Sequence, residues 1–450
     1  MIERPRTDPM PPTDASTDPR RGPAAPDLRE IARQDGPRRI LFLSHYFPPE
    51  GNAPANRVYE SCKRWVNAGH EVTVITCVPN HPSGVVYEGH KSRFRRQVEM
   101  VEGIKVIRVW TVLAANKGRV RRSLNYASYL MSAVFVGLFT KRPDVLIATS
   151  PQFFCGLAGT IVRTLRRVPF ILEIRDIWPE SISTVGALKS RVLLKPLEWM
   201  ERWMYHSATH IVTLGDGYRE QLLAKGVDLA KLSVVTNGID PSVYAPQESS
   251  ADLRQKFGLE GKFVCASVGT IGMASGLDVV LRAAARLKEI GRDDIVFLLV
   301  GEGAVREELQ ARAVAAGLDN VVFTGRQDKQ WMPAFLATAD ACLVHLVRKE
   351  LFRFVLPSKM FEAAAMERPI ILGVEGHAKK LLRDADAGLF IAPESEVDLV
   401  EAVTRLADDP EFARRLGQSG RRLVLRDFDR DVLSANYLEV LRQTWRSSTA

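Results

Sequence analysis

The chain has 450 residues, of which 46% are hydrophobic and 26% charged, and a formal net charge of +9. It is too long for a single hydrophobic core, so two domains are expected. The positive excess suits phosphorylated small molecules or an anionic membrane surface, but spread over this length it does not indicate a nucleic-acid-binding protein. The five cysteines are scattered without CxxC spacing, which is typical of buried free thiols in a reducing compartment.

The first residues, 1–36, are charged and rich in proline and have no apolar periodicity, so we interpret them as a disordered tail. They also lack the apolar core of a secretory signal, so a cytoplasmic protein is expected. Structure is predicted to begin with a buried strand at 39–44. A loop containing Gly51 and Asn52 follows it.

A helix at 56–68 and a strand at 71–77 complete a right-handed βαβ unit. The loop of this unit lies at the carboxyl end of the strands, where doubly wound sheets bind ligands. It is not G-x-G-x-x-G, which weakens a dinucleotide-oxidoreductase interpretation. The flexible Gly51-Asn52 step favours close approach of a substrate diphosphate or an acceptor.

The longest apolar run, 126–139, is about 14 residues long, whereas a bilayer-spanning helix needs about 20. We therefore predict no transmembrane helix. This run is flanked by basic residues, and a second basic segment at 189–205 contains Trp199 and Trp203. Two interpretations remain open: helices that lie on the inner membrane surface, or helices packed on a sheet.

Strands and helices alternate through the rest of the chain, which predicts an α/β protein with mostly parallel sheets. We predict a first domain at 37–242, a second at 243–428, and a final segment at 429–450 that crosses back onto the first domain. Two such sheets facing one another form a cleft lined by the loops at the carboxyl ends of their strands. The further predicted strands are 105–110, 144–149, 170–174, 210–214, 232–235, 263–268, 295–300, 321–323 and 341–346.

The segment 347–372 gives the clearest indication of a ligand-binding site. Pro357 suits the first turn of a helix, so the free amides of Ser358 and Lys359 point out of the helix N-terminus. These amides and the Lys359 ammonium can bind phosphate. Glu362 lies three residues beyond Lys359 on the same helical face and can bind vicinal hydroxyls. The pattern suits a diphosphate bonded to a sugar, and a surface helix with an ordinary Lys–Glu pair is the alternative.

Two polar residues that end strands in the first half are catalytic candidates. Asp176 follows the strand 170–174 and could accept a proton or stabilise positive charge on a sugar ring. The alternative is a carboxylate that pairs with Arg175 or caps the next helix. His45 follows the first strand, with a structural histidine as its alternative. Arg57 and the loop containing Asn80 and His81 are candidate acceptor contacts.

Several motifs occur in a fixed order over about residues 38–445. They are HYFPPEGNAPANRV, PNHPSG, EIRDIWPES, NGID, VGTIG…SGLDVVL, LLVGEG, NVVFTGR, PSK…E…P and GHAKKLLRDADAGLFI. Together they resemble the nucleotide-sugar-dependent glycosyltransferases of family 4. A narrower likeness, carried by the first three motifs, is to the bacterial subgroup that builds O-antigen, capsule and colanic-acid-type polysaccharide.

The resemblance implies the GT-B fold, in which two Rossmann-like domains face one another and a C-terminal helix crosses between them. It implies that the second domain binds the donor and the first the acceptor. Glu180 is a further candidate acceptor contact, beside Arg57, Asn80 and His81. Glu362 matches the second glutamate of an E-x7-E pattern and should bind the ribose. Gly325 and Arg326 should touch the nucleobase, and Ser358 and Lys359 the diphosphate.

The chain departs from this family pattern at two points. The first glutamate of E-x7-E falls at Phe354, so its contact comes from another group such as Glu350 or is absent. The basic residues that commonly follow the glycine of the segment from Val268 are missing, so Lys359 and Arg348 are expected to carry the phosphate charge. The remaining histidines have no metal-binding spacing, and neither a metal nor a cofactor is expected.

We therefore expect a retaining glycosyltransferase that moves a sugar from a nucleotide diphosphate sugar to a hydroxyl of a glycan. The basic aromatic segments point to a polyprenyl-diphosphate-linked acceptor and to peripheral binding at the inner face of the membrane. Two alternatives remain. One is a nucleotide-sugar 2-epimerase, and the other is a non-catalytic subunit that binds sugar nucleotides or acts as a scaffold.

Overall fold

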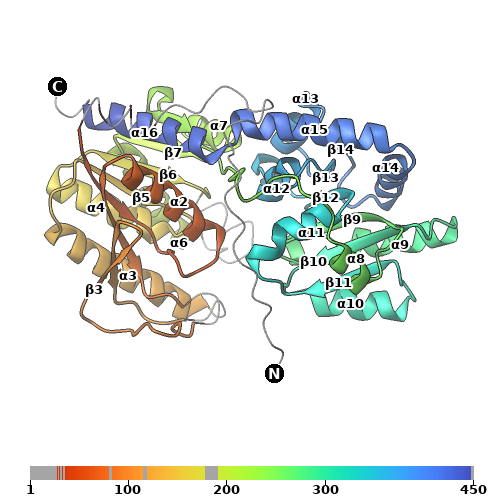
Figure 1. Cartoon of the computed structure of the whole chain (residues 1–450). Coiled ribbons are helices and arrows are strands. Elements are labelled where there is room, and N and C mark those ends of the chain that lie inside the picture. The colour runs from red at the N-terminus through yellow and green to blue at the C-terminus, as the bar shows by residue number, and fades with distance from the viewer. Residues whose placement is uncertain are drawn as a thin grey trace.

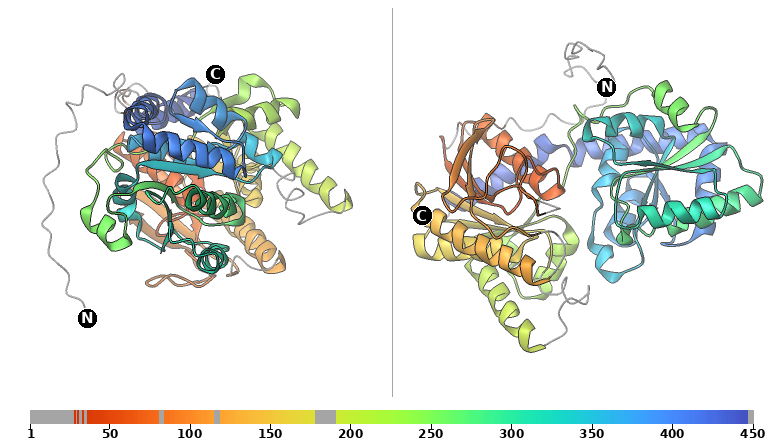
Figure 2. Two further views of the ribbon diagram at one scale, coloured as in Figure 1. Left: turned by 90° about the vertical axis from the view of Figure 1, so that its right-hand side faces the viewer. Right: turned by 90° about the horizontal axis from the view of Figure 1, so that it is seen from below.

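The computed structural model describes residues 36–80, 84–114, 119–177 and 191–446, together with Leu28, Glu30 and Arg33. It contains two α/β domains that lie side by side, joined by a hinge and by the last two helices (Figures 1 and 2). The elements of the first domain are β1 Arg39–Leu43, α2 Ala53–Asn67, β2 Glu71–Cys77, β3 Gln97–Val101, β4 Ile104–Val109, α3 Arg119–Phe139, β5 Val145–Thr149, α4 Phe153–Arg166, β6 Phe170–Ile174, α6 Arg191–Ser207, β7 His210–Thr213, α7 Asp216–Ala224, η2 Leu229–Lys231 and β8 Leu232–Val234.

The second domain repeats the alternation of strand and helix. Its elements, with the crossover helix α16, are α8 Ala251–Phe257, β9 Phe263–Val268, η3 Met273–Ser275, α9 Asp278–Glu289, β10 Ile295–Val300, α10 Arg306–Ala315, β11 Val321–Gly325, η4 Lys329–Trp331, α11 Met332–Thr338, β12 Ala341–His345, η5 Glu350–Phe354, α12 Ser358–Ala365, β13 Ile370–Gly373, α13 His377–Asp384, β14 Gly388–Phe390, α14 Glu396–Asp408, α15 Pro410–Asp427 and α16 Arg430–Arg446.

The two sheets have the strand orders β3-β4-β2-β1-β5-β6-β7-β8 and β11-β10-β9-β12-β13-β14. All neighbours pair in parallel except β3, which is antiparallel to β4. The chain reverses its direction of winding between β1 and β5 and again between β9 and β12. Ligands bind at such switch points, outside the carboxyl ends of the strands.

Helices cover both faces of the first sheet because alternate residues of its strands face opposite sides. Ile40 and Phe42 of β1 pack in a core with α2 and α16, whereas Leu41 and Leu43 pack in a core with α3, α4 and α6. The described parts of the two basic segments, in α3 and α6, thus pack one face on the sheet. Among the described residues, no helix has both the length and the apolar character to cross a bilayer.

The hinge after β8 is packed too closely for any residue larger than glycine at position 238. A Cβ on Gly238 would collide with the carbonyl of Phe428 and the side chain of Leu433. The next residue, Ile239, is 2% exposed and forms a β-bridge with Asp429. The NGID motif thus fixes the hinge against the junction of α15 and α16, from which α16 runs back over the first domain (Figure 1).

The five cysteines are all buried and free, which confirms the prediction of buried thiols. The strand β3 was not predicted from the sequence. It is an edge strand with a half-exposed pattern, and Val98 and Met100 are 53% and 65% exposed. An edge strand has one neighbour only, so its sequence carries a weak apolar signal.

Candidate functional site

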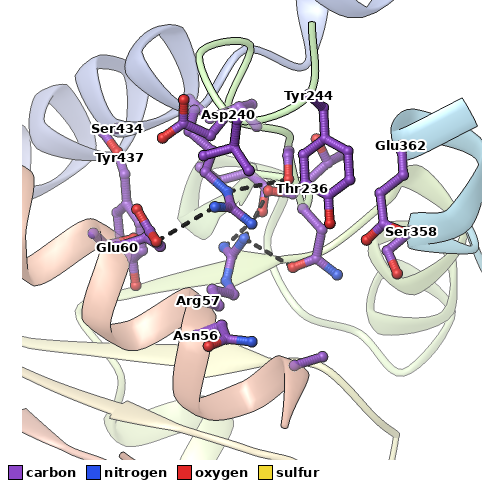
Figure 3. Close-up of a pocket in the computed structure, with 18 of the residues that line it drawn as sticks. Asn56, Arg57, Glu60, Thr236, Asp240, Tyr244, Ser358, Glu362, Ser434 and Tyr437 are labelled. Atoms are coloured by element: carbon purple, nitrogen blue, oxygen red, sulfur yellow. Dashed lines mark hydrogen bonds and ion pairs between the residues drawn. The ribbon is translucent and has the colours of Figure 1, made fainter. Parts of the chain in front are cut away.

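The cleft between the domains contains two adjoining cavities that share Asn237 of the hinge. The first measures about 370 Å³ and lies where α2, the hinge, α12 and α16 meet (Figure 3). The second measures about 230 Å³ and lies between the end of β6 and the residues that lead into α12. Both cavities are therefore lined by residues of both domains.

Glu362 and Ser358 project from α12 into the first cavity, where Tyr244 lies beside them (Figure 3). Burial raises the pKa of the Glu362 carboxyl, and the positive charges of Lys359, Lys329 and Arg430 act against that shift. A partly dehydrated carboxylate surrounded by cations is suited to accept hydrogen bonds from hydroxyl groups of a ligand.

Lys359 lies at the first turn of α12, beneath the loop that follows β9. A Cβ on Gly269 would come within 2.7 Å of Lys359 Cε, so the glycine makes room for this lysine. Burial lowers the pKa of the Lys359 ammonium, while Glu362 acts to raise it. The helix begins after Pro357, and no side chain caps its N-terminus. Its first amides are therefore open to an anion.

The loops after β9 and β10 approach so closely that only glycine fits between them. Gly269 donates a hydrogen bond from its amide to the Val300 carbonyl at 2.8 Å, and a Cβ on Gly301 or Gly303 would collide with the facing backbone. Gly269 and Gly301 also have φ angles of +122° and +136°. The VGTIG and VGEG motifs thus form a compact backbone surface at the carboxyl edge of the second sheet.

Asp176, Arg175 and Tyr218 line the second cavity from the first domain. The Ser150 hydroxyl accepts hydrogen bonds from the backbone amides of Arg175 and Asp176, at 2.6 and 3.3 Å, and so fixes the end of β6. Burial raises the pKa of Asp176 to about 6, although the neighbouring Arg175 acts to lower it. A carboxyl group that titrates near neutral pH in a cleft suits proton transfer.

The second catalytic candidate, His45, is 5% exposed and is not among the residues that line the two cavities. Its ring packs against Tyr46, Tyr126 and Tyr129, with centroid distances of 4.9, 5.4 and 4.9 Å. This aromatic environment at the end of β1 is typical of a structural histidine.

Arg57 lines the first cavity, but its guanidinium is held within the protein. It pairs with Glu173 at 3.0 Å and donates hydrogen bonds to the Val235 and Thr236 carbonyls at 2.8 and 2.6 Å. Arg57, which was predicted to contact the acceptor, thus binds partners within the protein. These interactions could not be predicted from the sequence, because the partners lie more than a hundred residues away from Arg57.

Three more predicted residues also have local roles. The Asn52 side chain caps α2 by accepting a hydrogen bond from the Ala55 amide at 2.9 Å, and Gly51 precedes that cap. The Asn80 side chain donates to the Val78 carbonyl at 2.7 Å. None of Gly51, Asn52 and Asn80 lines either cavity.

The remaining donor candidates lie at the ends of strands in the second domain. Gly325 ends β11 with a φ of +68°, and the exposed Arg326 follows it. Arg348 is exposed and forms an ion pair with Glu375 at 3.7 Å. None of these three candidates lines the cavities. Two other candidates, His81 and Glu180, lie outside the described residues.

The position of the absent first glutamate is occupied by Phe354, which packs away from both cavities. It contacts the ring of His377 and lies so close to α7 that a Cβ on Gly217 would meet it at 2.8 Å. The suggested substitute, Glu350, is exposed and pairs with Arg353 at 3.2 Å. Within the described ranges, no three His, Cys, Asp or Glu side chains come together as a metal site.

Sequence reasoning missed several residues that line the cavities. Lys329 and Gln330 come from η4, Tyr244 from the segment after the hinge, and Arg175 and Tyr218 from the first domain. Arg175 adjoins a predicted residue and was considered only as a partner for Asp176. The others carry no motif, so only the tertiary structure could identify them.

Comparison with known families places each half of the chain in a glycosyltransferase family. Residues 52–238 match the family described as glycosyl transferase 4-like domain, and residues 249–423 match the one described as glycosyl transferases group 1. The first match covers β2 to β8 of the first domain, and the second covers the whole second sheet from β9 to β14.

Individual relatives agree with this assignment. WcaI of Escherichia coli K12, named as a colanic acid biosynthesis glycosyl transferase, is 26% identical over 415 residues, which are 88% of this chain and 99% of WcaI. The alpha-D-kanosaminyltransferase of Streptomyces kanamyceticus is 28% identical over 228 residues, 49% of this chain and 57% of that enzyme. The chain thus matches little more than half of the second relative's length.

Among solved structures, HepE from Anabaena in complex with UDP-glucose has a TM-score of 0.66 at 17% identity, over 90% of this chain and 100% of HepE. The expectation of two facing Rossmann-like domains is confirmed. The chain therefore belongs to the glycosyltransferases that join a glycosyl transferase 4-like domain to a group 1 domain, and it is an enzyme of GT-B fold.

Proposed function

We propose that this enzyme transfers a sugar from a nucleotide diphosphate sugar to a hydroxyl of a glycan, with retention of anomeric configuration. The observation that carries the proposal is the pair of adjoining cavities. Glu362 and Ser358 line one of them, Asp176 lines the other, and Asn237 lines both. A carboxylate suited to hydroxyls and an open helix N-terminus thus lie beside a second carboxylate from the opposite domain.

In this proposal the second domain binds the donor. Glu362 accepts hydrogen bonds from the ribose hydroxyls, while Ser358, Lys359 and the α12 N-terminus bind the diphosphate. Gly325 and Arg326 lie at the nucleobase. The bond between the sugar and the diphosphate breaks, and the acceptor oxygen bonds to the sugar on the same face. Positive charge from the protein stabilises the leaving diphosphate, so no metal ion or cofactor is needed.

Asp176 acts at the reacting centre. It either accepts the proton that leaves the acceptor hydroxyl or stabilises positive charge on the sugar ring. Its raised pKa supports the first role, because a base of pKa about 6 is largely ionised at neutral pH and still holds a proton more strongly than an ordinary carboxylate.

We further propose a lipid-linked acceptor, with peripheral binding at the inner face of the membrane. Supporting this, α3 exposes Leu124, Met131, Phe135 and Phe139 along one stripe, at 52%, 74%, 66% and 69% of their surface. Neither α3 nor its neighbour α4 contains an acidic residue. The likeness to a colanic acid biosynthesis glycosyl transferase supports a role in polysaccharide assembly.

The test is a thermal-shift and hydrolysis screen with UDP-, GDP-, ADP- and dTDP-sugars. Wild type is compared with Glu362→Ala and with a control, Glu401→Ala, which changes an exposed residue of α14. We expect one nucleotide to stabilise wild type and the control and to lose this effect in Glu362→Ala. Equal binding by Glu362→Ala would refute the donor site at α12.

A non-catalytic sugar-nucleotide-binding subunit is the second candidate, favoured by the phenylalanine at position 354. Such a subunit would bind a nucleotide sugar without hydrolysis or transfer, and Asp176→Asn would change nothing. Turnover that Asp176→Asn abolishes would exclude it. Conversion of the donor sugar without any acceptor would instead indicate an epimerase.

A further inference from the structure

The Arg175 side chain is buried in the cleft. The residue is 8% exposed and lines the second cavity beside Asp176. Among the described residues, no group accepts a hydrogen bond from its Nε or Nη1. The nearby Glu173 carboxylate is already bonded to Arg57 and to the Thr149 hydroxyl.

A buried charge without hydrogen bonds is costly, so its presence calls for an explanation. Burial lowers the pKa of Arg175 to about 10, and Glu173 acts to raise it. The guanidinium therefore remains charged at neutral pH. The backbone amide of Arg175 donates a hydrogen bond to the Ser150 hydroxyl, which fixes the point where the side chain leaves the main chain.

The opposite wall of the cavity is formed by Val355 and Leu356, which lead directly into Pro357 and the N-terminus of α12. A cation of the first domain thus lines a cavity of about 230 Å³ whose facing residues in the second domain lead into an open helix N-terminus. Both groups favour an anion between them. The planar fork of an arginine binds two oxygens of one phosphate.

We propose that Arg175 binds the oxygens of a diphosphate group that lies between β6 and α12. This inference rests on the proposed function, which supplies two sources of that group. One source is the donor nucleotide, and the other is a lipid-diphosphate acceptor. In either case Arg175 joins the two domains through the ligand.

The test compares wild type, Arg175→Met, Arg175→Lys and a control, Arg202→Met, which changes an exposed arginine of α6. Isothermal titration calorimetry measures the binding of UDP, GDP, ADP and dTDP, of the matching monophosphates and of inorganic pyrophosphate. Pyrophosphate is titrated both alone and with the best nucleotide at saturation. Thermal unfolding is recorded for each variant.

If Arg175 binds the donor diphosphate, Arg175→Met weakens the nucleoside diphosphate about 10- to 100-fold and leaves the monophosphate unchanged. Pyrophosphate then competes with the nucleotide. If Arg175 binds an acceptor diphosphate, nucleotide binding is unchanged, while pyrophosphate binds alongside the nucleotide in wild type and is lost in the variant. Arg175→Lys keeps part of the binding, and the control keeps all of it.

The melting temperature separates a ligand contact from a structural role. Because Arg175 lacks hydrogen-bond partners at two nitrogens, Arg175→Met should melt no lower than wild type. Unchanged binding of every probe, or a general loss that accompanies a lower melting temperature, would overturn the inference. If no nucleotide binds wild type, the donor site fails, and pyrophosphate alone still tests Arg175.

Discussion

Arg57 of α2 and Glu173 of β6 form an ion pair of 3.0 Å in which the two side chains are only 10% and 1% exposed. The same guanidinium donates hydrogen bonds to the carbonyls of Val235 and Thr236, where the chain leaves the first domain. One side chain thus connects the centre of the first sheet to the hinge. The position from which the second domain departs depends on this contact.

Arg57→Met should cost about 3–5 kcal/mol of unfolding free energy, because it leaves the Glu173 carboxylate buried without its partner. The double variant with Glu173→Gln should lose less than Arg57→Met alone. Urea unfolding of the three proteins measures both effects. An equal loss in the single and double variants would show that the hinge carbonyls, rather than the buried carboxylate, dominate the cost.

The same pair predicts a dependence of stability on pH. Burial acts to raise the pKa of Glu173, but Arg57, Arg175 and the Thr149 hydroxyl together hold that pKa below its usual value. A folded-state pKa below the unfolded value of about 4.3 gives stability that is present above pH 4.3 and lost as the pH falls through the folded pKa. The difference in stability between wild type and the double variant should shrink in that acid range.

Asp176→Asn should lower the turnover number by about 10²- to 10⁴-fold, the range for removal of a general base. In wild type, turnover should fall as the pH drops through about 6, because the carboxylate takes up a proton there. The residual activity of the variant should lack this acid limb. A variant profile with the same limb would assign it to another group.

Asp176→Asn, although less active than wild type, should be more stable than wild type at neutral pH. The folded-state pKa of Asp176, about 6, is above the unfolded value of about 3.9, so the folded state binds more protons between these values. Stability contributed by this group is present below pH 3.9 and lost as the pH rises through 6. Asp176→Asn should therefore unfold at a higher temperature than wild type at pH 7.5, and a lower temperature would contradict the assignment.

The fold could be predicted because local patterns determine it. The predicted strands 170–174 and 295–300 coincide with β6 and β10, whose residues are all buried; β10 is a continuous apolar run, and β6 is apolar except for Glu173. The edge strand β3 was missed because two of its five residues face solvent. The pairing of an edge strand depends on a neighbouring strand that cannot be identified from the local sequence.

Residues of the candidate site likewise differ in how far the sequence could predict their roles. Glu362 and Ser358 could be placed on one face of a helix from spacing alone, since they are four positions apart in the sequence. The buried partners of Arg57 could not be inferred from the sequence, because they come from β6 and the hinge. The significance of Arg175 was also hidden, since a missing hydrogen-bond partner is visible only in three dimensions.

Gly303→Ala should weaken nucleotide binding and destabilise the second domain, because its Cβ would collide with the backbone of Ile271. The control is Gly226→Ala, at a position with a φ of +84° and nothing within 4 Å of the added Cβ, which costs about 1 kcal/mol. Gly303→Ala should cost several times that value in urea unfolding. Equal costs would mean that the two loops move apart easily.

Glu362 should distinguish ribonucleotides from deoxyribonucleotides. If its carboxylate accepts hydrogen bonds from the ribose, wild type should bind the 2′-deoxy form of its nucleoside diphosphate more weakly than the ribose form. In Glu362→Ala the two should bind alike, about 10- to 100-fold more weakly than the ribose form binds wild type. Calorimetry with both proteins and both nucleotides measures the interaction energy between Glu362 and the 2′-hydroxyl directly. Preserved discrimination in the variant would place the ribose elsewhere.

The exposed stripe of α3 should bind anionic vesicles. The face combines Phe135 and Phe139 with the basic residues that flank the helix, and it lies beside a cavity lined by Arg39, Lys105 and Lys141. Each phenylalanine that enters the headgroup layer contributes about 1.5–3 kcal/mol, and the cations add attraction that salt screens.

Phe135→Ser with Phe139→Ser should therefore lower the affinity for phosphatidylglycerol vesicles at least about tenfold in a sedimentation assay. The control is Val314→Ser, which changes a residue of the second domain that is 76% exposed and should bind as wild type does. Wild type should dissociate from the anionic vesicles in high salt and should not bind neutral vesicles. Equal sedimentation of the double variant would contradict the prediction, and concentration-dependent self-association lost in that variant would assign the stripe to a second copy of the chain.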